Sequence, residues 1–505
     1  MDHLTHGEDE IGGMPLELTR QMKSMWGRVF VLLLGVVILT VVTSHAAGFA
    51  TPGVGIKARS MGGAFRGLAD DWSAVSSNPA GLAFLKSSEL NVTLGTYSTG
   101  FSYTPNVTAN GYDMGFKDGK ERFPLNDIFP LPSFAGIAVP SQTPGWVFGG
   151  AIFWPHDVNY SWDLFRSPSN YNNDYIFARK NFRSDLDVID FHPAVAHKLR
   201  DNLSVGGGLS LTSADLVYRR VLFVDNPLGS GYNHYPYDRF LADFQVNGKG
   251  FAVGGNAGVF WHLSDNLSVG FSGQTPVTVR LKGKAQLDMA WPVNYALSHG
   301  RVVLGGDTLT SDKFFSGNYR EGYSAKSRDL STFEMDLKLP AQIGVGVGWT
   351  ASSRLTLAFD AGVTFWSVVD SWKIELAGDG LNTSVGYLPV VVVPFGWKNQ
   401  IRISGGAEYA ARENLMLRGG LYYDGLTAPD STFGPAFPDI GSKLGVTFGG
   451  AYTISGHLEL AAAQELGFYS KRNITGIGTG VGETVYPGEY KSLRTETLFS
   501  MTYRF

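Results

Sequence analysis

The last seven residues of the chain are Phe499-Ser500-Met501-Thr502-Tyr503-Arg504-Phe505. Apolar or aromatic side chains occupy every second position, and small or polar ones stand between them. A period of two places one set on each face of a strand, which a helix could not do. A terminal Phe505 with Tyr503 two residues before it is typical of the last strand of an outer-membrane β-barrel. We therefore expect residues 490–505 to form a closing strand that pairs with the first, because lipid tolerates no open sheet edge.

The same alternation recurs along the chain beyond residue 87. Val345-Gly346-Val347-Gly348-Trp349 is one example, and Leu355-Thr356-Leu357-Ala358-Phe359 is another. No segment in this region has a convincing helical period of 3.6 residues. The pattern predicts an all-β chain in which each strand has one apolar face and one small or polar face.

Turn residues separate these strands at two kinds of spacing. Very short connections occur at Thr143-Pro144-Gly145, Arg200-Asp201-Asn202 and Ser264-Asp265-Asn266, among others. Long polar or aromatic connections lie between them, roughly at residues 104–132, 163–183, 221–242, 286–330, 379–398, 428–441 and 471–488. Short turns at one end and long loops at the other are typical of bacterial outer-membrane barrels, whose strand number is even. The spacing predicts a transmembrane barrel of about fourteen antiparallel strands.

Composition and charge agree with an exported membrane barrel. Of 505 residues, 17% are charged, and none is cysteine. The formal net charge of −4 disfavours a nucleic-acid partner, which would need a basic face. The absence of cysteine suits a protein that crosses an oxidising compartment. A soluble β-sandwich or propeller is the alternative fold, and the loop lengths and the aromatic end count against it.

One apolar run, residues 29–42, is shorter than the roughly 20 residues that a spanning helix needs. Arg28 precedes it and small residues follow it, which is typical of a secretory signal peptide. We expect cleavage after Ala46, so that residues 1–46 form the signal region. Because the first residues are acidic rather than basic, we expect translation to start at Met22 or Met25. An uncleaved membrane anchor is the alternative.

The sequence contains no pattern of residues that indicates catalysis or metal binding. Its 10 histidines occur singly, without the His-x-x-x-His spacing of a zinc site. It has neither a Gly-x-Ser-x-Gly elbow nor a Walker loop. An outer-membrane lipase would need a serine beside His156, His192 or His197, and a lumen or interface position suits these histidines better. We expect no enzyme activity, no cofactor and no metal.

Residues 47–86 differ from the rest of the chain. They contain Gly62-Gly63-Ala64-Phe65 and Asn78-Pro79-Ala80. This segment resembles the N-terminal hatch of FadL-type outer-membrane transporters, in which Asn-Pro-Ala is a characteristic motif. The resemblance covers the whole mature chain and implies a hatch of short helices at residues 47–86 and a barrel at residues 87–505. Other stretches that resemble family landmarks are Leu339-Pro340, Thr364-Phe365-Trp366-Ser367 and Leu417-Arg418-Gly419-Gly420-Leu421-Tyr422-Tyr423-Asp424.

The resemblance implies a monomeric barrel that takes up hydrophobic molecules and whose lumen is plugged by the hatch. Long-chain fatty acids are the expected substrates. Uptake of aromatic hydrocarbons is one alternative, and a surface receptor or adhesin without transport is another. In this family a shift of the mature N-terminus is expected to release the ligand sideways. Phe49 would be the plug side chain, and Asn78, Pro79 and Ala80 would shape the hatch wall near the exit.

Sideways release needs a gap in the sheet, and family members kink their third strand inward to make one. The third strand is expected here at residues 146 to about 162. Proline cannot donate to a strand ladder, and glycine within a strand often marks a bend. Gly149, Gly150, Trp154 and Pro155 are therefore expected to mark the lateral opening. The alternative is that Pro155 only ends the strand at the membrane surface.

Ligand capture is expected at the connection of residues 221–242, which is unusually apolar. The expected contacts are Phe223, Tyr232, Tyr235 and Phe240, because an exposed apolar patch usually marks binding. Packing of this loop against its neighbour is the alternative. A carboxylate headgroup would also need a cation in the lumen. The candidates on strands are Arg219, Arg220, Arg280, Lys282 and Lys338.

The expected location is the outer membrane of a Gram-negative bacterium, which the chain would cross many times. The expected partners are a long-chain fatty acid or another hydrophobic small molecule, outer-membrane lipid and lipopolysaccharide, and the barrel assembly machinery.

Overall fold

The computed structural model describes residues 53–105, 119–122, 133–164, 181–225, 239–290, 302–304, 307–309, 328–383, 386–435, 442–475 and 488–505. The expected signal region and the side chains of Phe49, Tyr232 and Tyr235 lie outside these residues. The backbones of Phe223 and Phe240 are described, but their side chains are not. Within the described residues, no helix has both the length and the apolar character needed to cross a membrane.

In the described part of the hatch, from residue 53 onward, there are three short helices: α2 (Ile56–Ser60), α3 (Ala74–Ser77) and η1 (Pro79–Phe84). Their boundaries follow from local sequence. Gly55, before α2, has a φ of 87°, which glycine adopts without strain. Asn78 caps η1 by accepting a hydrogen bond from the Ala80 amide at 3.3 Å. Pro79 then occupies the first helical position, where no amide donor is needed.

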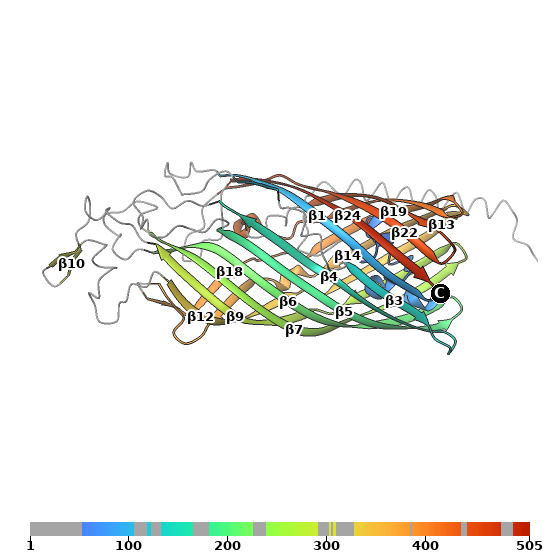
Figure 1. The fold of residues 1–505 in the computed structure, drawn as a ribbon, viewed down its shortest axis with the longest axis horizontal. Helices are drawn as coiled ribbons and strands as arrows, with labels where there is room; N and C mark the ends of the chain where they lie inside the picture. The colour runs from blue at the N-terminus through green and yellow to red at the C-terminus, as the bar shows by residue number, and fades with distance from the viewer. Residues whose placement is uncertain are drawn as a thin grey trace, which may run out of the picture. The chain divides into compact units, whose positions relative to one another are not determined.

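Antiparallel strands follow the hatch and close into a barrel (Figure 1). Their bounds are β1 (Glu89–Pro105), β2 (Gly119–Arg122), β3 (Phe134–Pro140), β4 (Trp146–Trp162), β5 (Phe182–Arg200), β6 (Leu203–Asp225), β7 (Arg239–Ser264), β8 (Leu267–Gln274), β9 (Val277–Ala290), β12 (Arg328–Leu339), β13 (Gln342–Ser352), β14 (Leu355–Thr364), β15 (Ser371–Leu376), β18 (Val390–Pro394), β19 (Gln400–Arg412), β20 (Leu415–Asp424), β21 (Lys443–Thr453), β22 (Leu458–Tyr469), β23 (Arg472–Ile474) and β24 (Gly488–Arg504). The remaining elements are the hairpins β10 (Val302–Leu304) with β11 (Asp307–Leu309) and β16 (Leu381–Asn382) with β17 (Tyr387–Leu388), and the turns η2 (Trp366–Val368) and η3 (Asp430–Thr432).

The first and last strands close the barrel. β1 pairs with β24 from Glu89 opposite Arg504 to Pro105 opposite Gly488, as the C-terminal stretch predicts. Six barrel strands consist of two successive pieces, namely β2 with β3, β8 with β9, β12 with β13, β14 with β15, β18 with β19 and β22 with β23. With each pair counted as one strand, the described residues form a closed antiparallel barrel of fourteen strands, which confirms the prediction.

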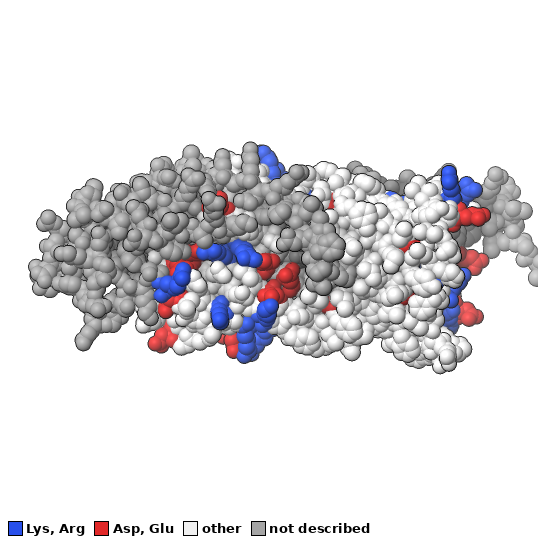
Figure 2. Space-filling view, in the orientation of Figure 1, with Lys and Arg blue, Asp and Glu red and all other residues white. Residues whose placement is uncertain are grey.

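The outer face of the wall carries an apolar band. On β7, the outward-facing Phe251, Val253, Val259, Trp261 and Leu263 are between 40% and 61% exposed. With the usual rise and tilt of a strand, this stretch is roughly 30 Å tall, close to the apolar band of about 25 Å on outer-membrane barrels. Figure 2 shows a largely uncharged surface between two groups of charged side chains. The alternation predicted from sequence is therefore the alternation between lipid-facing and lumen-facing residues.

Glycines on the lumen face let the hatch backbone touch the wall. A Cβ on Gly206 of β6 would lie 2.5 Å from the carbonyl carbon of Pro79. A Cβ on Gly420 of β20 would lie 2.2 Å from the carbonyl carbon of Met61. Both distances are well inside van der Waals contact, so a larger residue cannot occupy either position while the hatch is in place.

Candidate functional site

Asn78, Pro79 and Ala80 lie where the hatch meets β6 and β7. Asn78 is fully buried, and its Nδ2 donates to the carbonyl oxygens of Arg66 and Val259 at 3.1 Å each. Ser204 Oγ of β6 donates to the Ala80 carbonyl at 2.7 Å. A buried amide with its donors and acceptor in use holds its neighbours in one arrangement. The motif ties the hatch to the wall, and its expected place near a ligand exit stays a prediction.

Ion pairs hold α2 to strands β19, β22 and β24. Arg59 Nη1 lies 2.9 Å from a Glu496 oxygen and 3.4 Å from a Glu465 oxygen, and all three side chains are buried. Lys57 Nζ lies 3.0 Å from a Glu408 oxygen. Buried charges such as these are stable only when they are paired. We call this set, with the groups that join it, the charged layer: Lys57, Arg59, Arg402, Glu408, Arg418, Asp424, Lys443, Glu465 and Glu496.

Asp360 of β14 receives the hatch backbone directly. Its Oδ2 accepts hydrogen bonds from the amides of Phe65 at 3.1 Å and Arg66 at 2.9 Å, and the residue is 1% exposed. The sequence analysis did not single out this residue. The sequence feature that could have indicated Asp360 is a carboxylate within a membrane strand. Charged residues in membrane-spanning segments face the interior and are functional.

Acidic groups also meet at the other end of the hatch. The Trp72 amide donates to Glu89 Oε2 at 2.9 Å. Burial raises the pKa of Asp71, and the negative charges of Glu89 and Asp70 also raise it, so that this pKa is about 7. Burial lowers the pKa of Lys57, but the Asp70 and Glu408 carboxylates outweigh it, so that this pKa is raised. At neutral pH, Lys57 is charged while Asp71 is near the midpoint of its titration.

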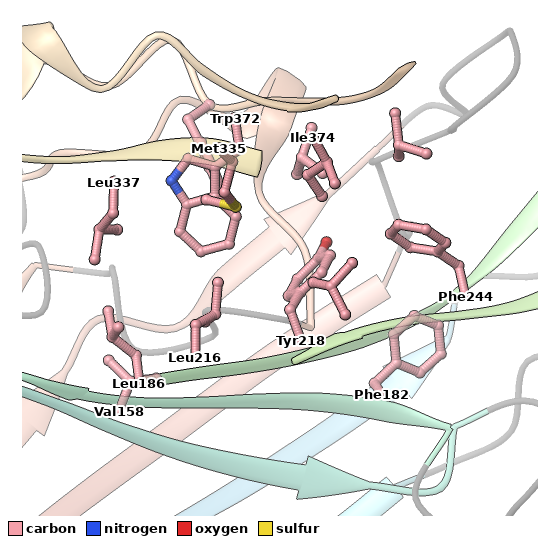
Figure 3. Packing of buried hydrophobic residues seen from close by; sticks show 14 of the residues in the cluster. Val158, Phe182, Leu186, Leu216, Tyr218, Phe244, Met335, Leu337, Trp372 and Ile374 are labelled. Carbon is pink, nitrogen blue, oxygen red and sulfur yellow. The ribbon is translucent and has the colours of Figure 1, made fainter. Parts of the chain in front are cut away.

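A second set of lumen side chains is apolar, and we call it the apolar lumen cluster. Figure 3 shows Leu216 and Tyr218 of β6 facing Leu337 of β12 and Trp372 of β15. The rings of Tyr218 and Trp372 meet edge to face at 5.6 Å. The principal further members are Phe101, Tyr103, Val158, Tyr160, Trp162, Phe182, Leu186, Val188, Phe244, Met335, Trp366, Ile374, Phe395, Trp397 and Phe433.

The third barrel strand, β4, has an irregularity at Trp154 and Pro155. These two residues lie opposite the single Ile189 of β5, because the register shifts between Phe153 and His156. Such a bulge bends the strand that carries it. The strand continues past Pro155 to Trp162, so the proline does not end it. Among the described residues, β4 pairs with β3 only up to Phe153.

Gly149 and Gly150 are regularly paired on both sides and do not form the bend. Gly149 faces the hatch, and a Cβ there would lie 2.7 Å from Val75 Cγ2. Gly150 faces outward, where a Cβ would meet nothing within 4 Å. The bend that we expected from these glycines comes from the proline instead, because proline cannot donate to the ladder.

The expected loop of residues 221–242 is shorter than predicted. Residues 221–225 belong to β6 and residues 239–242 to β7, with Phe223 paired with Leu241 and Val224 with Phe240. An apolar run with high strand propensity extends this hairpin beyond the apolar band. Phe223 and Phe240 therefore lie on strands rather than in the loop. Their expected role in capture, with that of Tyr232 and Tyr235, stays a prediction.

The candidate cations occupy different environments. The side chains of Arg280 and Lys282 are each 63% exposed and pair with Glu334, and Lys338 is also exposed. Arg219 forms a close ion pair with Asp243, and Arg220 is 2% exposed. Arg280, Lys282 and Lys338 therefore cannot meet a headgroup in the lumen.

The three singled-out histidines lie apart. His156 packs edge to face against Trp366 at 5.9 Å, and His197 stacks on Trp146 at 4.3 Å. His192 Nε2 lies 3.0 Å from Asn256 Oδ1. In the part of the chain that the structure describes, no group of His, Asp and Glu side chains could hold a metal.

Comparison with known proteins agrees with this geometry. A family model described as "Outer membrane protein transport protein (OMPP1/FadL/TodX)" matches residues 37–505. A FadL homologue of Pseudomonas aeruginosa matches with a TM-score of 0.69 and 19% identity, over 91% of this chain and 100% of its own. The toluene transporter TbuX of Ralstonia pickettii matches with a TM-score of 0.58 and 17% identity, over 90% of this chain and 99% of its own. TodX, a toluene transporter of P. putida, matches with a TM-score of 0.59 and 16% identity over the same shares. No curated protein matches the chain.

At these identities the solved structures establish the fold, and the family model establishes the family. Its match begins before the hatch and runs to the last residue of the closing strand. The chain therefore belongs to the OMPP1/FadL/TodX family of outer-membrane transport proteins, whose members are channels for hydrophobic compounds and not enzymes.

Proposed function

We propose that the protein takes up long-chain fatty acids or related hydrophobic molecules across the outer membrane of a Gram-negative cell. The ligand enters the lumen from outside, rests against the apolar lumen cluster and leaves sideways through the wall at β4. The hatch has to loosen for the ligand to pass, which makes Phe49 and the segment around Asn78 the expected moving parts.

The observation that carries this proposal is the apolar lumen cluster. The interior of a water-filled porin is polar, whereas Leu216, Leu337 and Trp372 here are each no more than 1% exposed. Burying one methylene stabilises by about 0.8 kcal/mol, so a chain of about sixteen gains on the order of 12 kcal/mol. A ligand in a water-filled pore would not gain this free energy, whereas a ligand against apolar walls would gain it.

The bulge of β4 supports the sideways exit. Trp154 and Pro155 lie opposite the single Ile189 of β5, so the ladder of β4 is interrupted at this point of the wall. A membrane barrel can part at a smaller cost in hydrogen bonds where its ladder is already interrupted.

Uptake of monoaromatic hydrocarbons is the second candidate function. The TbuX and TodX structures are of toluene transporters. The cluster also contains Trp162, Trp366 and Trp372, all fully buried, whose faces and edges suit a small aromatic ring.

The test is uptake of radiolabelled oleate and toluene by a strain that lacks its own transporter and expresses this protein. Entry of oleate supports the hypothesis of fatty-acid uptake, and entry of toluene alone supports the hypothesis of aromatic hydrocarbon uptake. If neither molecule enters although the folded protein is in the outer membrane, the proposal that the protein transports these molecules is wrong. The hypothesis that the protein is a surface receptor without transport is then favoured.

The exit is tested in the same strain with Pro155→Val. Valine restores an amide donor at the bulge, and we expect oleate uptake to fall several-fold at equal protein level. Pro193→Val is the matched control, because Pro193 lies on β5 opposite Gly150, outside the bulge. Equal uptake by the two variants would count against an exit at β4.

A further inference from the structure

Three cations follow one another on the outer face of β9. Arg280, Lys282 and Lys284 alternate with apolar or small residues, and the neighbouring Leu281 and Ala285 are no more than 1% exposed on the lumen side. The three basic side chains therefore face away from the lumen. Figure 2 shows a group of charged side chains over this part of the wall, where Figure 1 labels β9 and β12. Passage of a ligand through the lumen would not involve them.

These basic side chains lie just beyond the apolar band of the wall. Lys249 of β7 is directly opposite Lys282 of β9 and is exposed on the same face. Further along this face of β7, Phe251 and Val253 are 61% and 59% exposed, and Phe251 is about 7 Å from Lys249 along the strand. Because β7 reaches its short turn only after Ser264, Lys249 is on the side of the long connections, which faces outside the cell in such barrels. The cations are therefore at the level of the lipid headgroups of the outer leaflet.

Lys284 has uncharged polar neighbours on both sides. Asn247 of β7 is directly opposite it on one side, and Thr332 of β12 is directly opposite it on the other. All three side chains are exposed. In the part of the chain that the structure describes, Lys284 Nζ forms no ion pair, whereas Lys249 and Lys282 each have one. An ammonium, an amide and a hydroxyl group can all donate hydrogen bonds, so this row suits an oxyanion.

The adjoining row adds two further cations. Lys249 Nζ lies 2.5 Å from an Asp215 oxygen, and Lys282 Nζ lies 2.6 Å from a Glu334 oxygen. These two carboxylates balance two of the three lysines and leave one positive charge in excess. Lys249 and Lys282 are also directly opposite each other, and like charges in that position destabilise a sheet. An anion beside Lys284 would be attracted by all three ammonium groups and would reduce their mutual repulsion.

The chemistry that fits this surface is a phosphate joined to apolar chains. Acyl chains would lie against Phe251 and Val253, and a phosphate at the edge of the band would reach Lys284. Arg280 lies nearer the band, but it is directly opposite Asp336, which balances its charge. In the outer leaflet of a Gram-negative outer membrane, lipopolysaccharide carries phosphates at the junction of its acyl chains and its sugars.

We propose that the outer face of β7, β9 and β12 binds a phosphate of the lipid A part of lipopolysaccharide. Lys284 is the principal cation, and Asn247 and Thr332 are the neighbouring hydrogen-bond donors. Lys249 and Lys282 strengthen the attraction from the adjoining row. The site is on the lipid side of the wall, so it does not depend on which molecule passes through the lumen. A lipid held there anchors this side of the barrel at a fixed depth in the outer leaflet.

The test compares lipid A with and without its phosphates. Native mass spectrometry of the full-length mature protein in a mild detergent measures the binding of each form. EDTA is present, because a divalent cation could otherwise bridge a phosphate to Glu334 or Asp336. Lys284→Gln is expected to weaken binding of the phosphorylated lipid about fivefold, the usual effect of one basic residue near an anionic headgroup, and to change binding of the dephosphorylated lipid by less than about twofold. Lys284→Arg keeps the charge and is expected to retain most of the preference for the phosphorylated form.

Lys373→Gln is the matched control. Lys373 is an exposed lysine of β15, and its neighbour on β18 is Val392 rather than another cation. We expect this variant to bind both forms of lipid A as the wild type does. Equal weakening by Lys284→Gln and Lys373→Gln would indicate a general attraction to positive charge and would overturn the proposed site.

Two further outcomes would contradict the proposal. One is unchanged binding of the phosphorylated lipid by Lys284→Gln, and the other is a wild type that binds the two forms of lipid A equally. Inorganic phosphate in excess is expected not to displace the lipid, because it lacks the chains that lie against Phe251. Displacement by inorganic phosphate would mean that the site recognises a free anion, and it would overturn the assignment to a lipid.

Discussion

The charged layer and the apolar lumen cluster occupy the same lumen but hold their partners by different physics. In the charged layer, each group has a particular partner at a particular distance, such as Arg59 with Glu496 at 2.9 Å. In the cluster, Leu216, Ile374 and their neighbours gain from any apolar contact, whatever its direction. Directional contacts hold the hatch in one position against the wall. Contacts without direction would allow a hydrophobic ligand to slide, as the proposed function requires.

The largest expected effect comes from breaking the charged layer at Arg59. Arg59→Met leaves Glu465 and Glu496 buried without the cation between them. Loss of one partner from a buried ion group costs about 3–5 kcal/mol. We expect the hatch to become sensitive to added protease while the barrel stays intact, and a hatch as resistant as in the wild type would show that the pairs contribute little.

The next effect tests the close contact of hatch and wall. Gly420→Val places a side chain where the Met61 carbonyl carbon would lie 2.2 Å from its Cβ. Overpacking of this kind costs about 1–3 kcal/mol, and here it should displace the hatch. Gly419→Val is the matched control on the same strand, because its Cβ would meet only the Thr447 carbonyl oxygen at 3.8 Å. Thermal unfolding and protease sensitivity of the two variants should differ clearly, and similar values would refute the contact.

A pair of conservative substitutions sharpens the comparison of the two regions. Leu216→Met keeps volume and apolar character in the cluster, so we expect it to cost less than about 1.5 kcal/mol. Glu465→Gln keeps shape but removes the charge that faces Arg59 and Lys443, and we expect roughly 1–3 kcal/mol. Denaturant unfolding measures both, and the reverse order would contradict the distinction between directional and non-directional contacts.

The smallest expected effect is a pH dependence at Asp71, which solvent partly screens. Because its pKa in the folded protein is raised to about 7 from an ordinary value near 3.8, the folded hatch holds a proton that the unfolded chain has lost. The free energy of unfolding should therefore fall as pH rises from about 4 to about 7 and level off above that.

Asp71→Asn keeps the acceptor for the Ser73 amide but removes the titration. It should flatten this part of the pH profile, relative to the wild type, in thermal unfolding measured between pH 4 and pH 8. A variant with the same slope as the wild type would place the origin of the slope elsewhere.

The sequence predicted the parts of the fold that repeat. An apolar residue at every second position, short turns alternating with long loops and an aromatic last strand are local features, and lipid allows only one closed arrangement of them. Pro155 likewise indicated an irregular third strand, because a missing amide donor is a property of the residue itself.

Prediction was weaker where strands change face. Phe271 of β8 is 54% exposed, yet Val279 of β9, also at an odd position, is fully buried. The break at Thr275-Pro276 reverses which positions face the lumen, so that Arg280 and Lys282 point outward. Such a reversal is set by pairing with neighbouring strands and leaves little trace in the alternation itself.

The amino-acid sequence by itself determined that this protein folds as a closed barrel of about fourteen strands, because alternation and turn spacing are local features. The hatch was indicated by the resemblance of residues 47–86. The apolar lumen cluster was not predicted, since the alternation indicated small or polar lumen faces. Only the tertiary structure decided which distant residues meet. Arg66 and Arg402 share one cavity although they are separated by most of the barrel in sequence, and Asp360 meets the hatch through the curvature of the closed wall. Barrel closure sets these distances, and neither the spacing nor the type of the residues encodes them.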